Sequence, residues 1–143
     1  MHKFLKLFLA ILSGVVFLYV SWSVIDWFVP KTIWTSRDCD LDLKAEADSP
    51  GDAWTAKAFY FLCGGPFATF EGSVVVIVKK GRRPSKADEV LQAGIRNAPI
   101  ELRWKAPDRL EIAVPLRAPI WDHKPDHAGV SINVNRDLLI PNS

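Results

Sequence analysis

The chain has 143 residues, of which 49% are hydrophobic and 24% charged, and its formal net charge is +2 at neutral pH. So small a net charge gives no electrostatic reason to expect a nucleic acid as a partner. Without its first thirty residues the chain keeps 113, enough for one domain with its own core and too few for two.

The first predicted element is a membrane anchor within residues 1–30. Its central run, Leu7–Ile25, has nineteen residues without a charge, and a helix of that length is about 28 Å long. The hydrocarbon core of a bilayer is about 30 Å thick, so the run is long enough to span it. Lys3 and Lys6 precede the run, and the positive-inside rule then places the N-terminus in the cytoplasm. We therefore expect a bitopic protein of the bacterial inner membrane whose C-terminal part is periplasmic or otherwise extracytoplasmic.

The end of the apolar run favours an uncleaved anchor. Trp22 and Trp27 lie where an aromatic belt meets the outer headgroups. The alternative is a cleaved signal peptide, for which Ser21–Ser23 is the best cleavage motif and no Ala-x-Ala is nearby. Ala10 and Gly14 form a small-xxx-small pair that would let two anchors approach, so the sequence permits a homodimer, although such pairs are common by chance and nothing else supports one.

The chain has two cysteines, Cys39 and Cys63, and both fall in the exported part. An oxidising compartment favours a disulfide between them. The bridge would close a loop of about 25 residues and contribute roughly 3.5 kcal/mol in the chain-entropy model. A redox pair would need a Cys-x-x-Cys spacing, and a structural zinc site needs more than two cysteines, so a structural bridge is the favoured interpretation.

After a tether over residues 31–37, the exported domain is predicted over residues 38–136. Apolar residues alternate with charged ones in Cys39–Leu43, the pattern of a half-buried strand. Ser49–Asp52 is a turn rich in proline and glycine. Ala53–Cys63 is apolar on both faces and predicts a central strand, and the β-branched run Val74–Val78 predicts a buried one.

The second half of the domain adds a hairpin and a last strand. Ser85–Gly94 fits a short helix capped by Ser85, or else an irregular strand. Two alternating runs around a Pro-Asp turn predict a β-hairpin over Ile100–Val114. Leu116–Gly129 reads as a loop, Val130–Val134 as a strand and 137–143 as a tail. The fold class is therefore mainly β: a small antiparallel meander or sandwich-like domain of about six strands, with one short helix as an option.

These elements occur in an order that resembles a family of uncharacterised, small, membrane-anchored bacterial proteins. In that family an S-P-D-G turn leads into a strand, a C-G step, a V-x-I strand and a W…L-x-I hairpin. The matching residues here are Ser49-Pro50-Gly51-Asp52, Cys63-Gly64, Val74–Val78, Trp104 and Leu110-Glu111-Ile112. The turn is also similar to the opening of a TolB-type propeller blade, although its order here is Ser-Pro-Gly-Asp. The resemblance covers residues 39–134 and implies the fold and the location, with no activity to carry over.

The strongest candidate for metal chemistry is the segment containing Asp122, His123, Asp126 and His127. Imidazoles and carboxylates are the usual ligands of Zn²⁺ and similar ions. Pro125 argues against a helix that would put both histidines on one face. A solvated polar loop is the alternative, and no cofactor is expected.

A basic segment is the second candidate, for contact with lipid headgroups or an acidic partner. Its members are Lys79, Lys80, Arg82, Arg83 and Lys86. Lysines at a hairpin tip also discourage edge pairing, which is the simpler interpretation. Residues 38–52, by contrast, carry six acidic side chains and one lysine.

Catalytic motifs give no support for an enzyme. There is no Gly-x-Ser-x-Gly, and Gly64-Gly65 lacks the Gly-Lys-Ser/Thr of a phosphate loop. Trp54, Trp104 and Trp121 either line a ligand groove or, more simply, fill the core. The leading hypothesis is a non-catalytic, protein-binding envelope protein in an accessory or immunity-type role. The alternatives are a metal- or small-molecule-binding module and, last, an envelope hydrolase.

Overall fold

The structure is a computed structural model that describes residues 12, 14–17, 19–20, 33–34, 38–64, 69–96 and 99–138. The chain divides into two compact units, Met1–Lys31 and Thr32–Ser143. The described residues of the first unit are helical. Most of the predicted anchor lies outside the described residues, and among those described no helix has the length and apolarity needed to cross a membrane.

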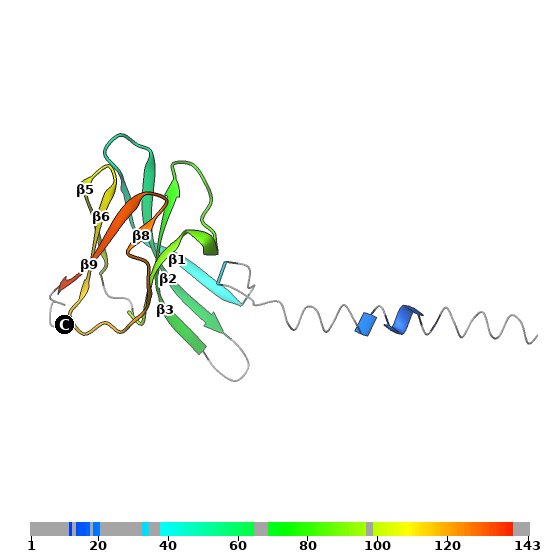
Figure 1. Cartoon of the computed structure of the whole chain (residues 1–143). Helices are drawn as coiled ribbons and strands as arrows, with labels where there is room; N and C mark the ends of the chain where they lie inside the picture. The colour runs from blue at the N-terminus through cyan, green and yellow to red at the C-terminus, as the bar shows by residue number, and fades with distance from the viewer. Residues whose placement is uncertain are drawn as a thin grey trace, which may run out of the picture. The chain divides into compact units, whose positions relative to one another are not determined.

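The second unit is mainly β, as predicted, and its two sheets are seen in Figure 1. The described strands are β1 (Cys39–Asp48), β2 (Trp54–Gly64), β3 (Thr69–Lys79), β4 (Glu89–Ala93), β5 (Glu101–Ala106), β6 (Arg109–Pro115), β7 (Ile120–His123), β8 (Asp126–His127) and β9 (Val130–Leu138). A short 3-10 turn, η1 (Lys86–Asp88), precedes β4.

The strands form a five-stranded sheet in the order β1-β2-β3-β4-β7 and a four-stranded sheet in the order β5-β6-β9-β8. All pairs are antiparallel except β6 with β9, which is parallel. The expectation of about six strands in a wholly antiparallel domain is therefore wrong in two respects. The described residues contain nine strands, and the chain crosses over between β6 and β9 instead of forming a simple meander.

β3 is the central strand of the five-stranded sheet, and both of its faces are buried. Val75 and Ile77 face the main core between the two sheets, whereas Val74, Val76 and Val78 belong to a second cluster on the outer face. All five side chains are fully buried. The continuous run of β-branched residues predicted such a strand, since a strand covered on both sides needs no polar alternation.

The hairpin of β5 and β6 is confirmed. Its register pairs Leu102 with Ile112 and Trp104 with Leu110 across a turn at Pro107–Asp108. Leu110 and Ile112 are fully buried in the main core, while Leu102 and Trp104 pack against it at its margin.

The choice between helix and strand after Ser85 is resolved as a short turn followed by a strand. The Asp88 carboxylate accepts hydrogen bonds from the Ser85 N–H (2.9 Å) and hydroxyl (2.7 Å), so the predicted cap is present. The helical turn nevertheless ends at Asp88, because Glu89–Ala93 pairs with β3. Tertiary pairing with a buried strand overrides the local helix signal.

The prediction of a loop over Leu116–Gly129 is wrong in part, because β7 and β8 lie within it. Pro119 and Pro125 stand just outside these strands, where a missing N–H breaks no ladder bond. The Pro125 carbonyl accepts a hydrogen bond from the Ile132 N–H (2.8 Å), and the Lys124 N–H donates to Val90 (2.9 Å). Residues 124–125 therefore link the two sheets.

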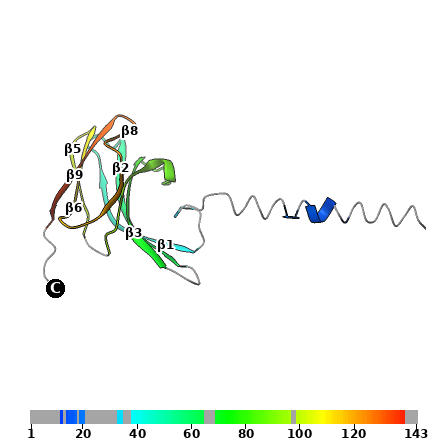
Figure 2. The same ribbon diagram turned by 60° about the horizontal axis from the view of Figure 1, so that its bottom comes forward.

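One end of the five-stranded sheet extends past the four-stranded sheet, as both views show (Figure 1, Figure 2). We call this end the arm, made of Cys39–Leu43, Phe59–Gly64 and Thr69–Ser73. The main core contains Ala56 and Ala58 of β2, but it does not reach Leu62, which is 39% exposed. The arm is thus a three-stranded ribbon whose inner face is not covered by the second sheet.

Candidate functional site

The structure divides the four predicted metal ligands between the two sheets. Asp122 and His123 lie on β7 of the five-stranded sheet, and both are exposed. Asp126 and His127 lie on β8 of the four-stranded sheet. Within the described residues, no three histidine, cysteine or acidic side chains are close enough to hold an ion together. The metal site stays a prediction that the described geometry does not favour.

His127 instead faces the buried carboxylate of Asp88, at 3.9 Å from Nε2 to Oδ1. Asp88 is only 2% exposed and already accepts hydrogen bonds from Ser85, and Arg82 forms an ion pair with it. This cluster connects the β3–β4 loop to β8. Its carboxylate is satisfied by partners within the domain, which is the chemistry of a structural junction.

The basic segment is partly neutralised by acidic neighbours. Lys80 lies 3.3 Å from Asp48 and 3.0 Å from Asp52. The hydrogen bonds from Thr55 and then from Lys80 hold the pKa of Asp48 below its ordinary value, and Asp52 and Asp48 raise the pKa of Lys80. In the described part of the chain, Lys79, Arg83 and Lys86 have no ion-pair partner.

An open polar hollow of about 470 Å³ lies between this segment and the outer face of β1 and β2. Its lining includes Glu46 and Lys57, which pair with each other at 3.1 Å, and also Lys80 and Arg83. Because most of the charges in the hollow compensate one another, it offers no concentrated charge to a small ligand.

The predicted disulfide is confirmed and lies at the end of the arm. Cys39 and Cys63 are directly opposite each other in the β1–β2 register, with a Cα–Cα distance of 3.9 Å. The Gly64 N–H donates to the Asp38 carbonyl (2.8 Å) next to the bridge. The bridge therefore fastens the edge strand where the second sheet no longer supports it.

Two large aromatic side chains are exposed on the outer face of the arm. Phe70 is 53% exposed and Trp121 44% exposed, and their rings stack with centroids 5.2 Å apart. Both rings also contact Phe61, which is fully buried (5.4 Å and 6.5 Å between centroids). Of the three tryptophans considered above, Trp54 and Trp104 pack against the main core, and Trp121 is the exception.

Trp121 packs on the backbone of two glycines, Gly72 and Gly94, which we call the glycine seat. A Cβ on Gly72 would come within 2.6 Å of the Trp121 ring, and a Cβ on Gly94 within 2.8 Å of it. The indole therefore packs directly on the backbone of β3 and of the segment after β4, where a side chain would displace it. This close packing restricts the positions open to the ring, which favours its use as a preorganised contact residue.

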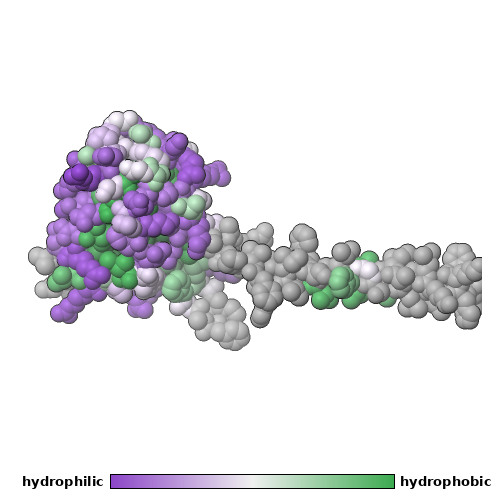
Figure 3. All heavy atoms as spheres, in the orientation of Figure 1, coloured by the Kyte–Doolittle hydropathy of each residue, from purple (hydrophilic) through white to green (hydrophobic). Residues whose placement is uncertain are grey.

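Leucines of the edge strand share this face. In the register, Leu41 lies opposite Phe61, and Leu43 lies opposite Phe59. Leu41 is 36% exposed and Leu43 45% exposed. We call these two leucines, Phe70 and Trp121 the apolar patch. Figure 3 shows hydrophobic surface among hydrophilic side chains in the lower part of the domain.

The apolar patch was missed by sequence reasoning because period-2 patterns do not say which face of a sheet is covered. A usable signal was present: Ala53–Cys63 is polar only at Thr55 and Lys57, and Val74–Val78 is apolar at every position, which is more apolar surface than one core face needs. Two apolar faces on one sheet require a second cover. Trp34 supplies part of it, packing edge-on against Phe59 with ring centroids 5.5 Å apart.

Trp34 also makes a polar contact with the sheet. Its indole N–H donates to Glu89, a carboxylate that is 6% exposed and also accepts a hydrogen bond from Gln92 (2.8 Å). Ile33 and Trp34, which fall in the predicted tether, thus pack on the outer face beside Val74, Val76 and Val78. The side chains of the apolar patch stay exposed beside this cover.

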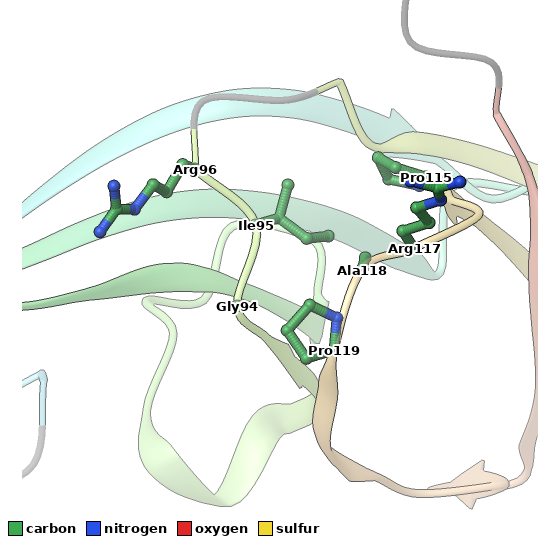
Figure 4. A pocket seen from close by; sticks show the side chains of 7 residues that line it. All are labelled: Gly94, Ile95, Arg96, Pro115, Arg117, Ala118 and Pro119. Atoms are coloured by element: carbon green, nitrogen blue, oxygen red, sulfur yellow. The ribbon is translucent and has the colours of Figure 1, made fainter.

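A small apolar pocket of about 180 Å³ lies beyond β4, lined by Gly94, Ile95, Arg96, Pro115, Arg117, Ala118 and Pro119 (Figure 4). Figure 4 shows the Arg96 side chain extending away from the other lining residues. Arg96 instead pairs with Glu71, which accepts the hydrogen bond of the Tyr60 hydroxyl and thereby raises the pKa of that hydroxyl. The pocket is smaller than the roughly 300–1,000 Å³ typical of ligand sites.

Comparison with known proteins gives no neighbour to argue from: no family model, no curated protein and no solved structure matches the chain. The family resemblance stated above stays a prediction.

Proposed function

We propose that the chain is a non-catalytic, single-pass envelope protein whose periplasmic β domain binds another protein through the apolar patch. The partner has a complementary apolar surface, with aliphatic or aromatic side chains that cover Phe70 and Trp121. An accessory subunit or an immunity-type inhibitor would act through such a contact.

The observation that carries the proposal is the exposed, stacked pair of Phe70 and Trp121 on a rigid base. Burying these two rings on binding would remove apolar surface from water, which stabilises a complex by about 25 cal/mol for each Å² buried. Exposed and preorganised aromatic residues of this kind are typical centres of protein interfaces. The bridge between Cys39 and Cys63 and the glycine seat under Trp121 support it further, because they reduce the conformational entropy that binding would cost.

Two features support the proposed extracytoplasmic location of the β domain, namely the charge pattern of the N-terminal sequence and the disulfide. A disulfide in a small domain is typical of an oxidising compartment, and the charge pattern around Leu7–Ile25 predicts that the domain reaches one. Labelling of free thiols in non-reduced protein from intact cells tests this. We expect neither Cys39 nor Cys63 to be labelled before reduction, whereas complete labelling of both would contradict an extracytoplasmic domain.

The binding function is tested by a crosslinked pull-down of the full-length chain from its native membranes, with mass spectrometry of the captured proteins. The test variant carries Phe70→Ser and Trp121→Ser. The matched control is Leu116→Ser, since Leu116 is 62% exposed and lies outside the apolar patch.

We expect one stoichiometric envelope protein with the wild type and with Leu116→Ser, and a loss of about tenfold or more with the double variant. Equal capture by all three proteins, or no stoichiometric partner of the wild type, would contradict the proposal.

A further inference from the structure

The edge strand β1 has two halves with different surroundings. Near its C-terminal end, the Trp104 indole N–H of the second sheet donates to the Ala47 carbonyl (3.0 Å). The first half, Cys39–Leu43, belongs to the arm, and among the described strands it pairs with β2 alone. A β-bulge between Leu43 and Ala45 separates the halves.

The backbone pattern shows which peptide groups of this half face away from β2. The Gly64 N–H donates to the Asp38 carbonyl (2.8 Å), and these residues lie one step beyond the opposed pair Cys39 and Cys63, so they continue the ladder as a hydrogen-bonded pair. Hydrogen-bonded and non-hydrogen-bonded pairs alternate along an antiparallel ladder. The N–H and C=O groups of Cys39, Leu41 and Leu43 therefore point outward, at the open edge of the sheet.

The side chains of the same half have different chemistry on its two faces. Leu41 and Leu43 are exposed on the face of the apolar patch. Asp40 and Asp42 lie on the opposite face, where Lys44 offsets one of them by pairing with Asp42 at 2.5 Å. An extended chain added to this edge would thus meet leucines on one face and carboxylates on the other.

We propose that Cys39–Leu43 is a docking edge for an extended segment of a partner protein, in which apolar residues alternate with lysine or arginine. Main-chain hydrogen bonds to the outward peptide groups would bind this segment. Its alternating apolar and basic side chains would make the binding specific, because they match the two faces of the edge strand. The inference rests on the proposed protein-binding function and names the chemistry of the partner.

Two observations favour this occupant over a second copy of the chain. Antiparallel pairing of this half with itself would place Asp40 or Asp42 opposite another aspartate, and like charges directly opposite each other destabilise a sheet. An edge strand that only had to be protected from pairing with other chains would also carry charged side chains on both faces. In this strand, Leu41 and Leu43 instead make one face apolar.

The test uses the full-length chain in non-ionic detergent and a seven-residue peptide of alternating lysine and valine with blocked ends. The control peptide has glutamate in place of lysine. Binding is measured by fluorescence anisotropy of a labelled peptide. We expect the lysine peptide to bind about tenfold or more tightly than the glutamate peptide. We also expect the joint change Asp40→Asn with Asp42→Asn to weaken binding of the lysine peptide by roughly threefold to tenfold.

The sharpest variant is Leu41→Pro, which removes an outward N–H without removing a hydrogen bond to β2. Its matched control is Leu41→Thr, which shortens the same side chain and keeps the N–H. We expect saturable binding with Leu41→Thr and none with Leu41→Pro. Retention of the Cys39–Cys63 bridge and of the tryptophan emission shows that the proline variant is folded; if it is not, the asparagine pair decides the question.

Equal binding by the two Leu41 variants, equal affinity for the two peptides, or no saturable binding at about millimolar peptide would overturn the inference. A dimer of the full chain that Leu41→Pro abolishes would assign the edge to a second copy and overturn it too. If Phe70 and Trp121 remain necessary for protein capture while no peptide binds, the proposed function stands without this edge. If the peptide binds as expected while no protein is captured, the proposed function fails and the edge remains.

Discussion

The two ends of the five-stranded sheet have the same strands but different support. At the covered end, β2 and β3 bury small and branched side chains against the second sheet, among them Ala56, Ala58, Val75 and Ile77. In the arm, the same strands carry Leu62, Phe70 and a covalent bridge, with no second sheet beneath them. The covered end is stabilised by packing, whereas the arm depends on a crosslink and leaves apolar side chains available for contact.

The largest expected difference between the two ends is the cost of truncating a leucine. Leu110→Ala, in the main core, should lower the free energy of unfolding by about 2–5 kcal/mol, because it leaves a cavity among fully buried side chains. Leu62→Ala, in the arm, should cost less than about 1 kcal/mol, since the side chain is already 39% exposed. Urea unfolding of the oxidised protein measures both. Equal costs would mean that the arm has a packed cover of its own.

The next largest effect is the loss of the bridge. Replacing Cys39 and Cys63 by serine should lower the free energy of unfolding by about 2–4 kcal/mol, because the unfolded chain regains the freedom of its loop. Hydrogen exchange should accelerate in the arm strands more than in β5 and β6, and a uniform acceleration would contradict the local role of the bridge.

A smaller effect is expected from filling the seat of Trp121. Gly72→Ala puts a Cβ within 2.6 Å of the indole and 2.9 Å of the Ala93 carbonyl, so it should cost about 1–3 kcal/mol and displace the ring. Gly64→Ala is the matched control in the same arm, because no atom beyond its own residue and its two chain neighbours lies within 4 Å of its added Cβ. Thermal unfolding and tryptophan emission report the two variants. A neutral Gly72→Ala would show that the indole is not seated on β3.

The smallest effect concerns pH at the covered end. Hydrogen bonds from Thr55 and Lys80 lower the pKa of Asp48 from its ordinary 3.8, so this carboxylate stabilises the fold above 3.8. That contribution should disappear as the pH falls below 3.8 and through the lowered pKa. Melting temperatures of the wild type and Asp48→Asn should therefore differ at neutral pH and converge in acid. A constant difference down to the acid limit would assign the effect to something other than ionisation.

Much of the β domain could be predicted from the sequence because its strands follow local patterns. The hairpin of β5 and β6 alternates cleanly around a Pro-Asp turn, and β3 is a continuous β-branched run. The bridge could be predicted because only one pairing of two cysteines exists. These features depend on residues close to one another or on simple counting.

The rest depends on contacts between distant segments, which patterns do not specify. The cap at Ser85 favours a helix, but the residues that follow it form β4 because they pair with β3. β7 and β8 are short strands next to prolines and could be recognised only from their partners. The stacking of Phe70 and Trp121 joins β3 to β7, fifty-one positions apart in the sequence. The apolar patch was hidden for the same reason.

The central claim is that the arm, and not the covered end, meets a protein. The most direct measurement places a photocrosslinking amino acid at position 70 in living cells, with position 116 as the matched exposed control. We predict one discrete protein adduct from position 70 and none from position 116. Adducts with lipid alone, or the same protein adduct from both positions, would contradict the claim.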